Sequence, residues 1–460
     1  MKIRLDNSDD QFQEKIKDLL HGPKNPEAEF LFSGRTYREI FEMAWKLAEH
    51  FSSLGLQNQA ICLCTQDRSV IAAALLAALS CEGPHLLIPY SDSDMVLNEM
   101  RRQVPYETAI ADVHQHFSSE ISRITVSPET LPASGLQRKN NINLDFEFLS
   151  LFTGGSTGKP KIWPKTIKNL FSEAFYLSEK FHFTSDDRIV ATVPPHHIYG
   201  ILFSVLIPLV SSACVMAGTP TFPHEIMNAV TQQKATVLVS VPMHYRTLSG
   251  STNSNHSLRI AFSSAGALDK TDSENFTKQT GIGITEIYGS TETGGIAYRC
   301  RAEDDAALTL FETVEVEIIG EKIHVRSDYI SPNLVRDEDG FYQTGDRGGK
   351  FDSNRFILYG RSDGIVKIGG KRVDLEEIRE KILSIPDVSD AMILSNPSKK
   401  GRENEIAAVI EGEIHPKQVR EFLSRQLEPY AQPRSIKVVD RIPRNNMGKY
   451  NMEMIRKLFG

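Results

Sequence analysis

AICLCTQDRSVIAAALLAALSCEGPHLLIPY, residues 60–90, contains the pattern that decides the fold. The run AICLCT (60–65) is apolar and predicts a buried strand, and SVIAAALLAALSC (69–81) predicts a buried helix. A Gly-Pro turn then leads into GPHLLIPY (83–90), a second apolar strand. Strand, helix and strand in this order predict a parallel sheet covered by helices.

The same rhythm extends on both sides of this stretch. TYREIFEMAWKLAEHFSSLG (36–55) has helical periodicity between a Thr36 cap and Gly55. Further on, apolar, β-branched runs end in Pro or Gly, and they predict four more strands, at 188–195, 211–218, 235–242 and 258–266. Ligands bind beyond the carboxyl ends of parallel strands, so we expect a site in the loops that follow them.

The pattern changes near residue 311. FETVEVEIIGEKIHVRS (311–327) alternates with period two and predicts a small antiparallel β subdomain. YGRSDGIVKIGGKR (359–372) is rich in Gly and charge and predicts a boundary between a large domain, 1–360, and a small α+β domain, 361–460. In the small domain we expect helices at 374–383 and 415–427 and strands at 390–395, 405–412 and 435–442.

Composition limits the classes of function. The chain has 460 residues, of which 40% are hydrophobic, and its net charge of -7 disfavours nucleic acid as the main partner. The five cysteines cannot all pair, and we interpret them as reduced core residues of a cytoplasmic protein. Cys62 and Cys64 lack a second ligand pair at zinc spacing, which favours a buried strand over a metal site.

Two apolar stretches are candidates for transmembrane segments. Residues 70–81 are too few to span a bilayer, and Pro208 interrupts GILFSVLIPLVSSACVMAG (200–218). We expect a buried helix followed by a buried strand there, and no transmembrane segment. The N-terminus also lacks the apolar core of a signal peptide.

LFTGGSTGKPKIW (151–163) is the first chemical motif. It is not a Walker A loop, because only three residues separate Gly154 from Gly158 and Pro160 follows Lys159. Its glycines still allow close backbone approach, so its N–H groups and hydroxyls can hold phosphate oxygens. A flexible Gly/Ser loop is the alternative if this motif is taken alone.

Two further motifs place suitable groups on short turns. EIYGSTETGG (286–295) carries an aromatic ring for a flat base, hydroxyls for a phosphate, and Glu292, whose carboxylate suits Mg²⁺. YQTGDRGG (342–349) carries Asp346, which suits two ribose hydroxyls. Taken singly, EIYGSTETGG could be an exposed acidic turn, and Lys449 in NNMGKY could be an ordinary surface lysine.

The order of these motifs resembles the adenylate-forming superfamily of acyl- and aryl-CoA synthetases, luciferases and peptide-synthetase adenylation domains. The resemblance runs from about residue 30 to the C-terminus. It implies ATP and Mg²⁺ as cofactors, with Glu292 on the metal and Lys449, His197, Thr291 and Glu292 as catalytic residues. The nucleotide-binding residues that it implies are Thr153, Gly154, Gly155, Ser156, Thr157, Gly158, Lys161, Ala265, Gly266, Tyr288, Gly289, Ser290, Asp346 and Arg361.

The resemblance also implies a substrate pocket and a moving domain. The pocket residues would be His197, Ile198, Gly200, Ser264, Ala265, Gly289 and Gly294. Asp363 would be the hinge of a mobile small domain, and Gly369 and Gly370 would line the path of the thiol. The sequence departs from the family pattern at Gly154, at Ile162-Trp163 and at Gln343, which replace a serine, a glycine with an apolar residue, and a basic residue.

The reaction implied is attack of a carboxylate on the α-phosphorus of ATP, which releases pyrophosphate, followed by transfer of the acyl group to a thiol, which releases AMP. The acceptor would be CoA or the phosphopantetheine arm of an acyl carrier protein. Amino-acid-activating relatives carry an aspartate after the position of His197, but Ile198 follows here, so an aryl or fatty acid is favoured. A stand-alone amino-acid adenylation enzyme and a non-catalytic nucleotide-binding regulator remain as alternatives.

Overall fold

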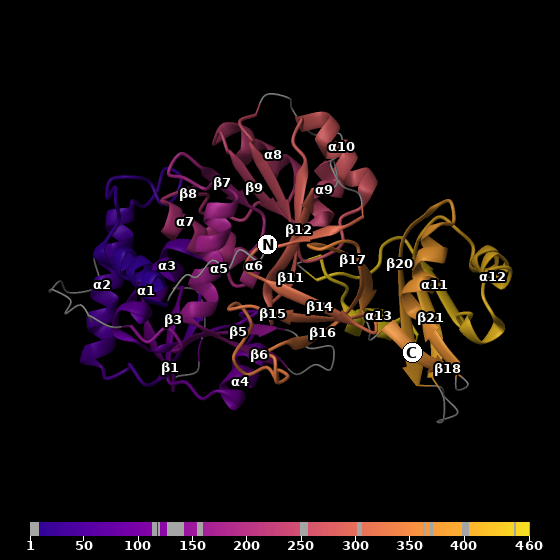
Figure 1. Cartoon of the computed structure of the whole chain (residues 1–460), viewed down its shortest axis with the longest axis horizontal. Coiled ribbons are helices and arrows are strands. Elements are labelled where there is room, and N and C mark those ends of the chain that lie inside the picture. Colours follow the sequence, from indigo (N-terminus) through magenta and orange to yellow (C-terminus); the bar gives the residue numbers. More distant parts are fainter. Residues whose placement is uncertain are drawn as a thin grey trace. The chain divides into compact units, whose positions relative to one another are not determined.

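A computed structural model of the chain (Figure 1) describes residues 9–112, 117, 120–126, 142–153, 160–248, 256–300, 306–361, 364–368, 371–397, 404–445 and 448–459. The chain divides into two compact units. The first comprises Met1–Glu315 and Val325–Tyr342, and the second comprises Val316–His324 and Gln343–Gly460. The predicted domain limits of 1–360 and 361–460 remain a prediction.

A largely parallel sheet forms the first part of the first unit. Its strands lie in the order β4 (Ser122–Ile124), β3 (Thr108–Ala111), β1 (Ala60–Cys64), β2 (His85–Ile88), β5 (Glu147–Thr153) and β6 (Lys161–Thr166). Neighbours run parallel except β5 and β6, which are antiparallel. Residues 60–90 therefore form a strand, a helix and a strand as predicted, with Cys62 and Cys64 buried on β1.

The same part of the chain forms four helices, α1 (Asp9–His21), α2 (Tyr37–Ser53), α3 (Arg68–Cys81) and α4 (Asp94–Gln103). The predicted Thr36 cap starts α2, since its hydroxyl accepts the Glu39 amide at 3.3 Å while Glu39 accepts the Thr36 amide at 2.6 Å. Residues 68–79 of α3 are all buried, which fits the run from Val70 to Leu79 being apolar on every face.

The second sheet of the first unit carries the other predicted strands. Its order is β13 (Leu308–Leu310), β12 (Gly294–Cys300), β11 (Ile284–Ser290), β10 (Ile260–Ser263), β9 (Val237–Ser240), β7 (Arg188–Ala191) and β8 (Cys214–Val215). From β11 to β8 the strands run parallel, so their carboxyl ends share one edge. The four runs that the sequence predicted form β7, β8, β9 and β10.

An apolar core joins this sheet to helices on one of its faces. Its buried residues come from β7, β9 and β10 and from α8 (Pro223–Gln232), α9 (Pro242–Leu248) and α10 (Lys270–Thr280), which Figure 1 shows beside these strands. Helix α5 (Ile167–Lys180) follows β6, and the Thr166 side chain caps it.

The apolar stretch at 200–218 is buried over 200–209 and 213–215, as predicted for its helix and its strand. It contributes to α6 (Ile198–Ile201), the π-helical turn η1 (Leu202–Leu206) and α7 (Ile207–Ser211), and then to β8. Among the residues that the structure describes, no helix is both long enough and apolar enough to cross a membrane.

The second unit confirms the predicted change of pattern. It contains most of β14 (Glu315–Ile319), β15 (Lys322–Arg326), β16 (Tyr342–Lys350) and β17 (Arg355–Arg361), which are neighbours in this order, and β16 pairs with β17 antiparallel. A hairpin of β18 (Ile365–Ile368) and β19 (Lys371–Asp374) follows.

The chain then forms the expected α+β part. Strands β20 (Val388–Pro397), β21 (Asn404–Gly412) and β22 (Ser435–Val439) form one sheet, accompanied by α11 (Leu375–Leu383), α12 (Pro416–Ser424), the 3₁₀ turn η3 (Pro429–Ala431) and α13 (Met452–Lys457). The sequence predicted α11, α12 and the three strands, but it did not predict α13.

Candidate functional site

The turn between β11 and β12 carries Thr291 and Glu292. The two strands pair as far as Ser290 opposite Gly294, so residues 291–293 form the connection. The hydroxyl of Ser290 contacts that of Thr293 at 3.0 Å and accepts the Thr293 amide at 3.2 Å. The Ser290 side chain therefore shapes the turn, and Thr291 and Glu292 are left half-exposed on it.

Two glycines make this turn possible. A Cβ atom on Gly289 would lie 2.3 Å from the carbonyl oxygen of Gly294, so the strands can approach only without a side chain there. Gly294 has a φ of +68°, and its Cβ would lie 2.7 Å from Oε2 of Glu173. Gly289 and Gly294 were both predicted as site residues. The close contacts of the turn are a sufficient structural reason for glycine at each position.

A buried lysine hydrogen-bonds to the backbone of the turn. Lys165, at 1% exposure, donates from Nζ to the carbonyl oxygens of Tyr329 at 2.9 Å and Glu292 at 3.4 Å. Burial lowers the pKa of Lys165 to about 8, against the attraction of the Glu173 and Glu292 charges. The Ser331 amide donates to the same Glu292 carbonyl at 2.8 Å, which fixes the backbone of Glu292 on two sides.

A buried carboxylate supports the other end of the turn. Oε1 of Glu173, on α5, accepts the Gly295 amide at 2.7 Å. Burial raises the pKa of Glu173 to about 7, while this hydrogen bond and the Lys165 charge oppose the shift. Asn169 lies one helical turn earlier and donates to the carbonyls of Asp328 and Ile330 at 2.6 and 3.2 Å.

Sequence reasoning missed these three residues. All three are buried, but only Asn169 and Glu173 share a helix, where they lie four residues apart on one face of α5, whereas Lys165 lies on β6. The spacing of Asn169 and Glu173 was the available signal for these two residues, because buried polar residues need partners and buried charges need them most; no such signal marked Lys165.

The loop after β10 lies next to the strand that carries Tyr288. The Ser264 hydroxyl donates to the carbonyl of Ile287 at 2.8 Å. Ala265 follows with a φ of +70°, an unusual conformation for a residue with a side chain. The structure thus brings Ser264 to Ile287, the residue before Tyr288, at the shared carboxyl edge of β10 and β11.

The loop after β7 places His197 at the start of α6. Its carbonyl accepts the Ile201 amide at 2.8 Å, and its ring lies 4.3 Å from that of His196. Burial lowers the pKa of His196 to about 4, so this neighbour is neutral at physiological pH. Gly200 permits the tight approach of this loop, since its Cβ would lie 1.9 Å from the Pro194 carbonyl oxygen.

The strands on either side of the predicted phosphate loop are described, but Gly154, Gly155, Ser156, Thr157 and Gly158 lie outside the described residues. Thr153, at the end of β5, faces Lys161, at the start of β6. The indole N–H of Trp163 donates to the Thr153 hydroxyl at 2.9 Å. Trp163, which departs from the family pattern, thus links β5 to β6 next to the predicted phosphate loop.

The remaining predicted residues belong to the second unit. The backbone of Asp346 on β16 is the antiparallel register partner of Arg361 on β17, so these two residues of the predicted ribose site lie on adjacent strands. Lys449 is exposed, and its amide donates to Oδ1 of Asn445 at 3.0 Å. Asp363, Gly369 and Gly370 lie outside the described residues.

The oxygen ligands at the turn suit a magnesium ion that binds together with a nucleotide. Glu292 offers a carboxylate and Thr291 a hydroxyl, both hard oxygen ligands. Among the described residues no three His, Cys, Asp or Glu side chains gather as a metal-binding group. Mg²⁺ commonly takes only one or two carboxylates and completes its shell with phosphate oxygens and water, so one carboxylate suffices.

Comparisons with known proteins cover nearly the whole chain. A family model described as AMP-binding enzyme matches residues 21–331, and one described as AMP-binding enzyme C-terminal domain matches residues 377–449. The chain is 27% identical to the mitochondrial malonate–CoA ligase ACSF3 of Mus musculus, over 67% of this chain and 64% of that protein. It is 23% identical to a 4-chlorobenzoate–CoA ligase of an Arthrobacter species, over 92% and 90%.

The fold also has solved counterparts. ATP-bound MatB from Rhodopseudomonas palustris superimposes with a TM-score of 0.84 at 20% sequence identity, covering 97% of this chain and 98% of that one. At this identity the likeness shows the fold, a helix-covered sheet architecture followed by a smaller C-terminal part.

Proposed function

The chain belongs to the AMP-binding enzyme family, and from this premise we propose that it activates a carboxylic acid with ATP and transfers the acyl group to CoA. The resemblance read from the motifs is thereby confirmed at the level of the family. Its substrates and the roles of its residues are part of the proposal.

The observation that carries the proposal is the turn at residues 291–293. It presents a hydroxyl and a carboxylate at the carboxyl edge of a parallel sheet, and Lys165 and Glu173 hold its backbone from the buried side. Fixed, preorganised groups of this kind stabilise charge that develops in a reaction. A merely acidic surface turn would need no such buried support.

The nucleotide would bind along this edge. Tyr288 would stack on the adenine, with Ala265 and Gly266 beside it, and Thr291 would donate to the α-phosphate. Asp346 would bind the ribose hydroxyls with Arg361 in support, and Thr153 and Lys161 would flank the loop that holds the β- and γ-phosphates. The indole of Trp163 donates to Thr153, which leaves the hydroxyl proton of Thr153 available to a phosphate oxygen.

The first step brings two anions together, so the protein must neutralise charge. Mg²⁺ at Glu292 would supply a Lewis acid that withdraws charge from the phosphates. The ammonium of Lys449 would stabilise the charge shared by the attacking carboxylate and the α-phosphate, and His197 would orient the carboxylate. Losing one such group typically costs ~10²–10³ in rate.

The acid would enter beside His197. The helical segment that follows is buried and apolar from Ile201 to Leu206 apart from Ser204, whose hydroxyl donates to the carbonyl of Gly200 at 2.7 Å. An α-ammonium group would find no carboxylate in this segment, which disfavours an amino acid. An aryl or fatty acid is therefore favoured. One relative is named for 4-chlorobenzoate, which is an aryl acid, whereas another is named for malonate.

CoA is the preferred acceptor, because these relatives are named as CoA ligases. A carrier-protein phosphopantetheine presents the same thiol and is the second candidate. The cytoplasmic location inferred from the cysteines stays a prediction, since the mouse relative is named as mitochondrial.

The test is acid-dependent exchange of labelled pyrophosphate into ATP. The panel comprises benzoate, 4-chlorobenzoate, octanoate, palmitate, malonate and L-phenylalanine, each with and without Mg²⁺. We expect Mg²⁺-dependent exchange with an aryl or fatty acid, and formation of its CoA thioester by mass analysis. Exchange with phenylalanine alone would favour amino-acid adenylation. ATP binding without exchange on any acid would favour a non-catalytic regulator.

A further inference from the structure

Lys449 lies in a short loop whose backbone is fixed at both ends. Arg444 and Tyr450 form an isolated antiparallel bridge. Inside it the Asn445 amide donates to the Lys449 carbonyl at 2.8 Å, and the Lys449 amide donates to Oδ1 of Asn445 at 3.0 Å. The position of the Lys449 Cα atom therefore follows from the position of the bridge.

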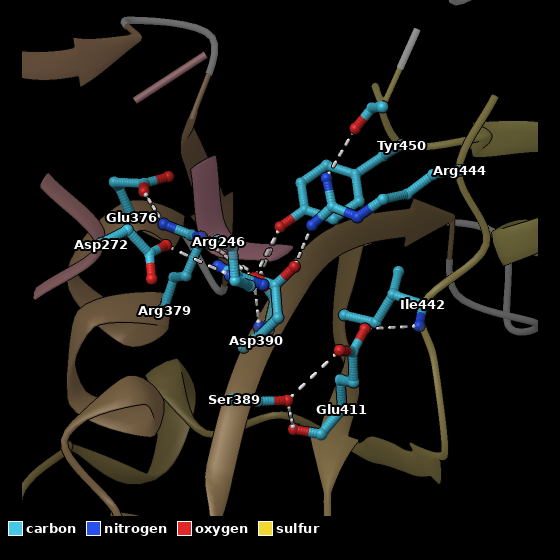
Figure 2. A network of polar contacts seen from close by, with 12 residues as sticks. Arg246, Asp272, Glu376, Arg379, Ser389, Asp390, Glu411, Ile442, Arg444 and Tyr450 are labelled. Carbon is cyan, nitrogen blue, oxygen red and sulfur yellow. Dashed lines mark hydrogen bonds and ion pairs between the residues drawn. The ribbon is translucent and has the colours of Figure 1, made fainter. Parts of the chain in front are cut away.

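One buried carboxylate contacts both residues of the bridge. Asp390, on β20, has a side chain only 4% exposed. Its Oδ2 accepts from Nη2 of Arg444, and its Oδ1 accepts from the hydroxyl of Tyr450 at 2.8 Å. Figure 2 shows both side chains converging on this carboxylate, and the Arg444 guanidinium lies 4.3 Å from the centre of the Tyr450 ring.

A third donor fixes the carboxylate itself. Arg379, on α11, donates from Nη2 to Oδ1 of Asp390 at 3.2 Å and from Nε to the Ala391 carbonyl at 2.7 Å. The Ala391 amide also donates to Oδ1 of Asp390 at 2.8 Å. With its oxygens engaged and buried in this way, the carboxylate cannot also bind a substrate, so it acts on the loop.

The chain leading into the bridge is tied to the next strand. The Ile442 amide donates to Oε2 of Glu411, on β21, at 2.9 Å (Figure 2). The Ile442 side chain packs with Ile455 and Val409 in a small core that Tyr450 also touches. This apolar contact holds the loop near the sheet, and the Asp390 contacts set its orientation, because charge-assisted hydrogen bonds are directional.

We propose that Asp390 is the positioning residue of Lys449, acting through Tyr450 and Arg444 to hold the loop that presents the lysine. The inference rests on the proposed function for its effect on rate, since Lys449 matters only where two anions meet. A displacement of about 1 Å at a catalytic group can cost about 10²-fold. The expected loss is therefore large and confined to the step that uses Lys449.

The experiment compares Asp390→Asn and Tyr450→Phe with the control Glu453→Gln. Glu453 lies on α13 and pairs only on the surface, with Lys457 at 2.7 Å, so this change matches the loss of a carboxylate outside the network. Each variant is assayed for pyrophosphate exchange with the best acid of the panel, and for thioester formation from CoA and the supplied adenylate of that acid.

Asp390→Asn should lower the exchange rate by about 10- to 100-fold, with the KM for ATP and the thioester step within about twofold of wild type. Tyr450→Phe removes one of the bonds and should give a smaller loss of the same kind. Adding Lys449→Ala to Asp390→Asn should cost nothing beyond Lys449→Ala alone, because residues that act as a unit are not additive. Glu453→Gln should behave as wild type.

Equal loss of both half-reactions in Asp390→Asn, or multiplied losses in the double variant, would assign Asp390 a general structural role and overturn the inference. Tyr450→Phe decides by the same criteria if Asp390→Asn does not fold, and unchanged exchange in a folded Asp390→Asn protein also refutes it.

A ligand-free measurement separates this inference from the proposed function. Amide hydrogen exchange of peptides covering 442–451 should be at least tenfold faster in Asp390→Asn, with β21 unchanged. If wild type exchanges no pyrophosphate with any acid, the proposed function fails, and this measurement still decides whether Asp390 holds the loop. Unchanged protection of 442–451 would contradict that it does.

Discussion

Lys165 shows how a single residue can matter without touching a substrate. A lysine at 1% exposure is costly, and its ammonium is satisfied by the carbonyls of Tyr329 and Glu292. The short stretch WPKT gives no sign of this from sequence, because β6 has no clear periodicity and the carbonyl partners are more than a hundred residues away. Long-range backbone contacts are invisible to motif reading.

Replacing Lys165 with Met should destabilise the first unit. The change leaves two buried carbonyls with fewer donors, which costs about 1–3 kcal/mol per group, and leaves Glu173 without the attraction of a nearby cation. Thermal unfolding should show a clear drop in Tm, while the control Lys168→Met, nearby in sequence on α5 and only partly buried, should change it little. Adding Glu173→Gln should restore part of the loss, and a double variant less stable than Lys165→Met would contradict this account.

Glu173 should make stability depend on pH in a defined window. Burial raises its pKa from 4.5 to about 7, so between these values the folded state binds more protons than the unfolded state. Its contribution to stability is then present at low pH and is lost as pH rises from about 4.5 to about 7. Glu173→Gln keeps an acceptor for the Gly295 amide but cannot ionise.

The Tm of wild type minus that of Glu173→Gln should therefore fall as the pH is raised from 5 to 7.5. The matched control is Glu179→Gln on the same helix, where the carboxylate is exposed and pairs with Lys15. A difference that is flat over this range, or that rises with pH, would refute the assignment.

At the scale of elements, most of what positions the site could be predicted. The apolar runs of the first unit formed β1, β2, β7, β8, β9 and β10, because β-branched, buried segments bounded by Gly and Pro have few alternatives. The β5–β6 pairing around the phosphate loop was not predicted, and Pro164 within β6 is a residue type that ordinarily disfavours a strand. Pro164 is tolerated because β6 is the edge strand of its sheet.

The β11–β12 turn gives an element-scale prediction through Gly294. Gly294→Ala places a Cβ 2.6 Å from that of Tyr329 and 2.7 Å from Oε2 of Glu173, at a φ of +68°. We expect a loss of stability of about 1–3 kcal/mol and a large fall in pyrophosphate exchange, because the turn must shift.

Gly320→Ala is the matched control for this prediction. Its φ is +55°, but a Cβ there meets nothing within 4 Å, so it carries the backbone strain without the collision. Equal losses for the two variants in thermal unfolding would mean that backbone strain alone explains the effect of Gly294→Ala.

At the scale of the whole molecule, the roles of the predicted site residues stay predictions, and what the structure adds is the contacts that hold some of them. Asp346 and Arg361 are register partners on the adjacent strands β16 and β17, and their role in ribose binding stays a prediction. The Asp390 network could not be predicted, because it joins residues 379, 390, 444 and 450, which no local pattern relates. The residues that form a turn are close together in the sequence and can be predicted from it. The residues that support the turn come from distant parts of the chain and cannot.

The two units divide the predicted chemistry between them. Thr291 and Glu292 belong to the first unit and Lys449 to the second. The proposed reaction requires the lysine during adenylate formation, and a mobile small domain hinged at Asp363 would withdraw it before the thiol arrives. The two half-reactions should therefore differ in their dependence on Lys449.

The most direct test is the pair of half-reactions of Lys449→Ala, with Lys457→Ala as the control for loss of an exposed lysine in the same C-terminal region. The account predicts that Lys449→Ala lowers acid-dependent pyrophosphate exchange by ~10²–10³-fold and leaves thioester formation from a supplied acyl-adenylate within about twofold of wild type. Full exchange activity in Lys449→Ala, or equal loss of both half-reactions, would contradict the claim that this cation lets the two anions meet.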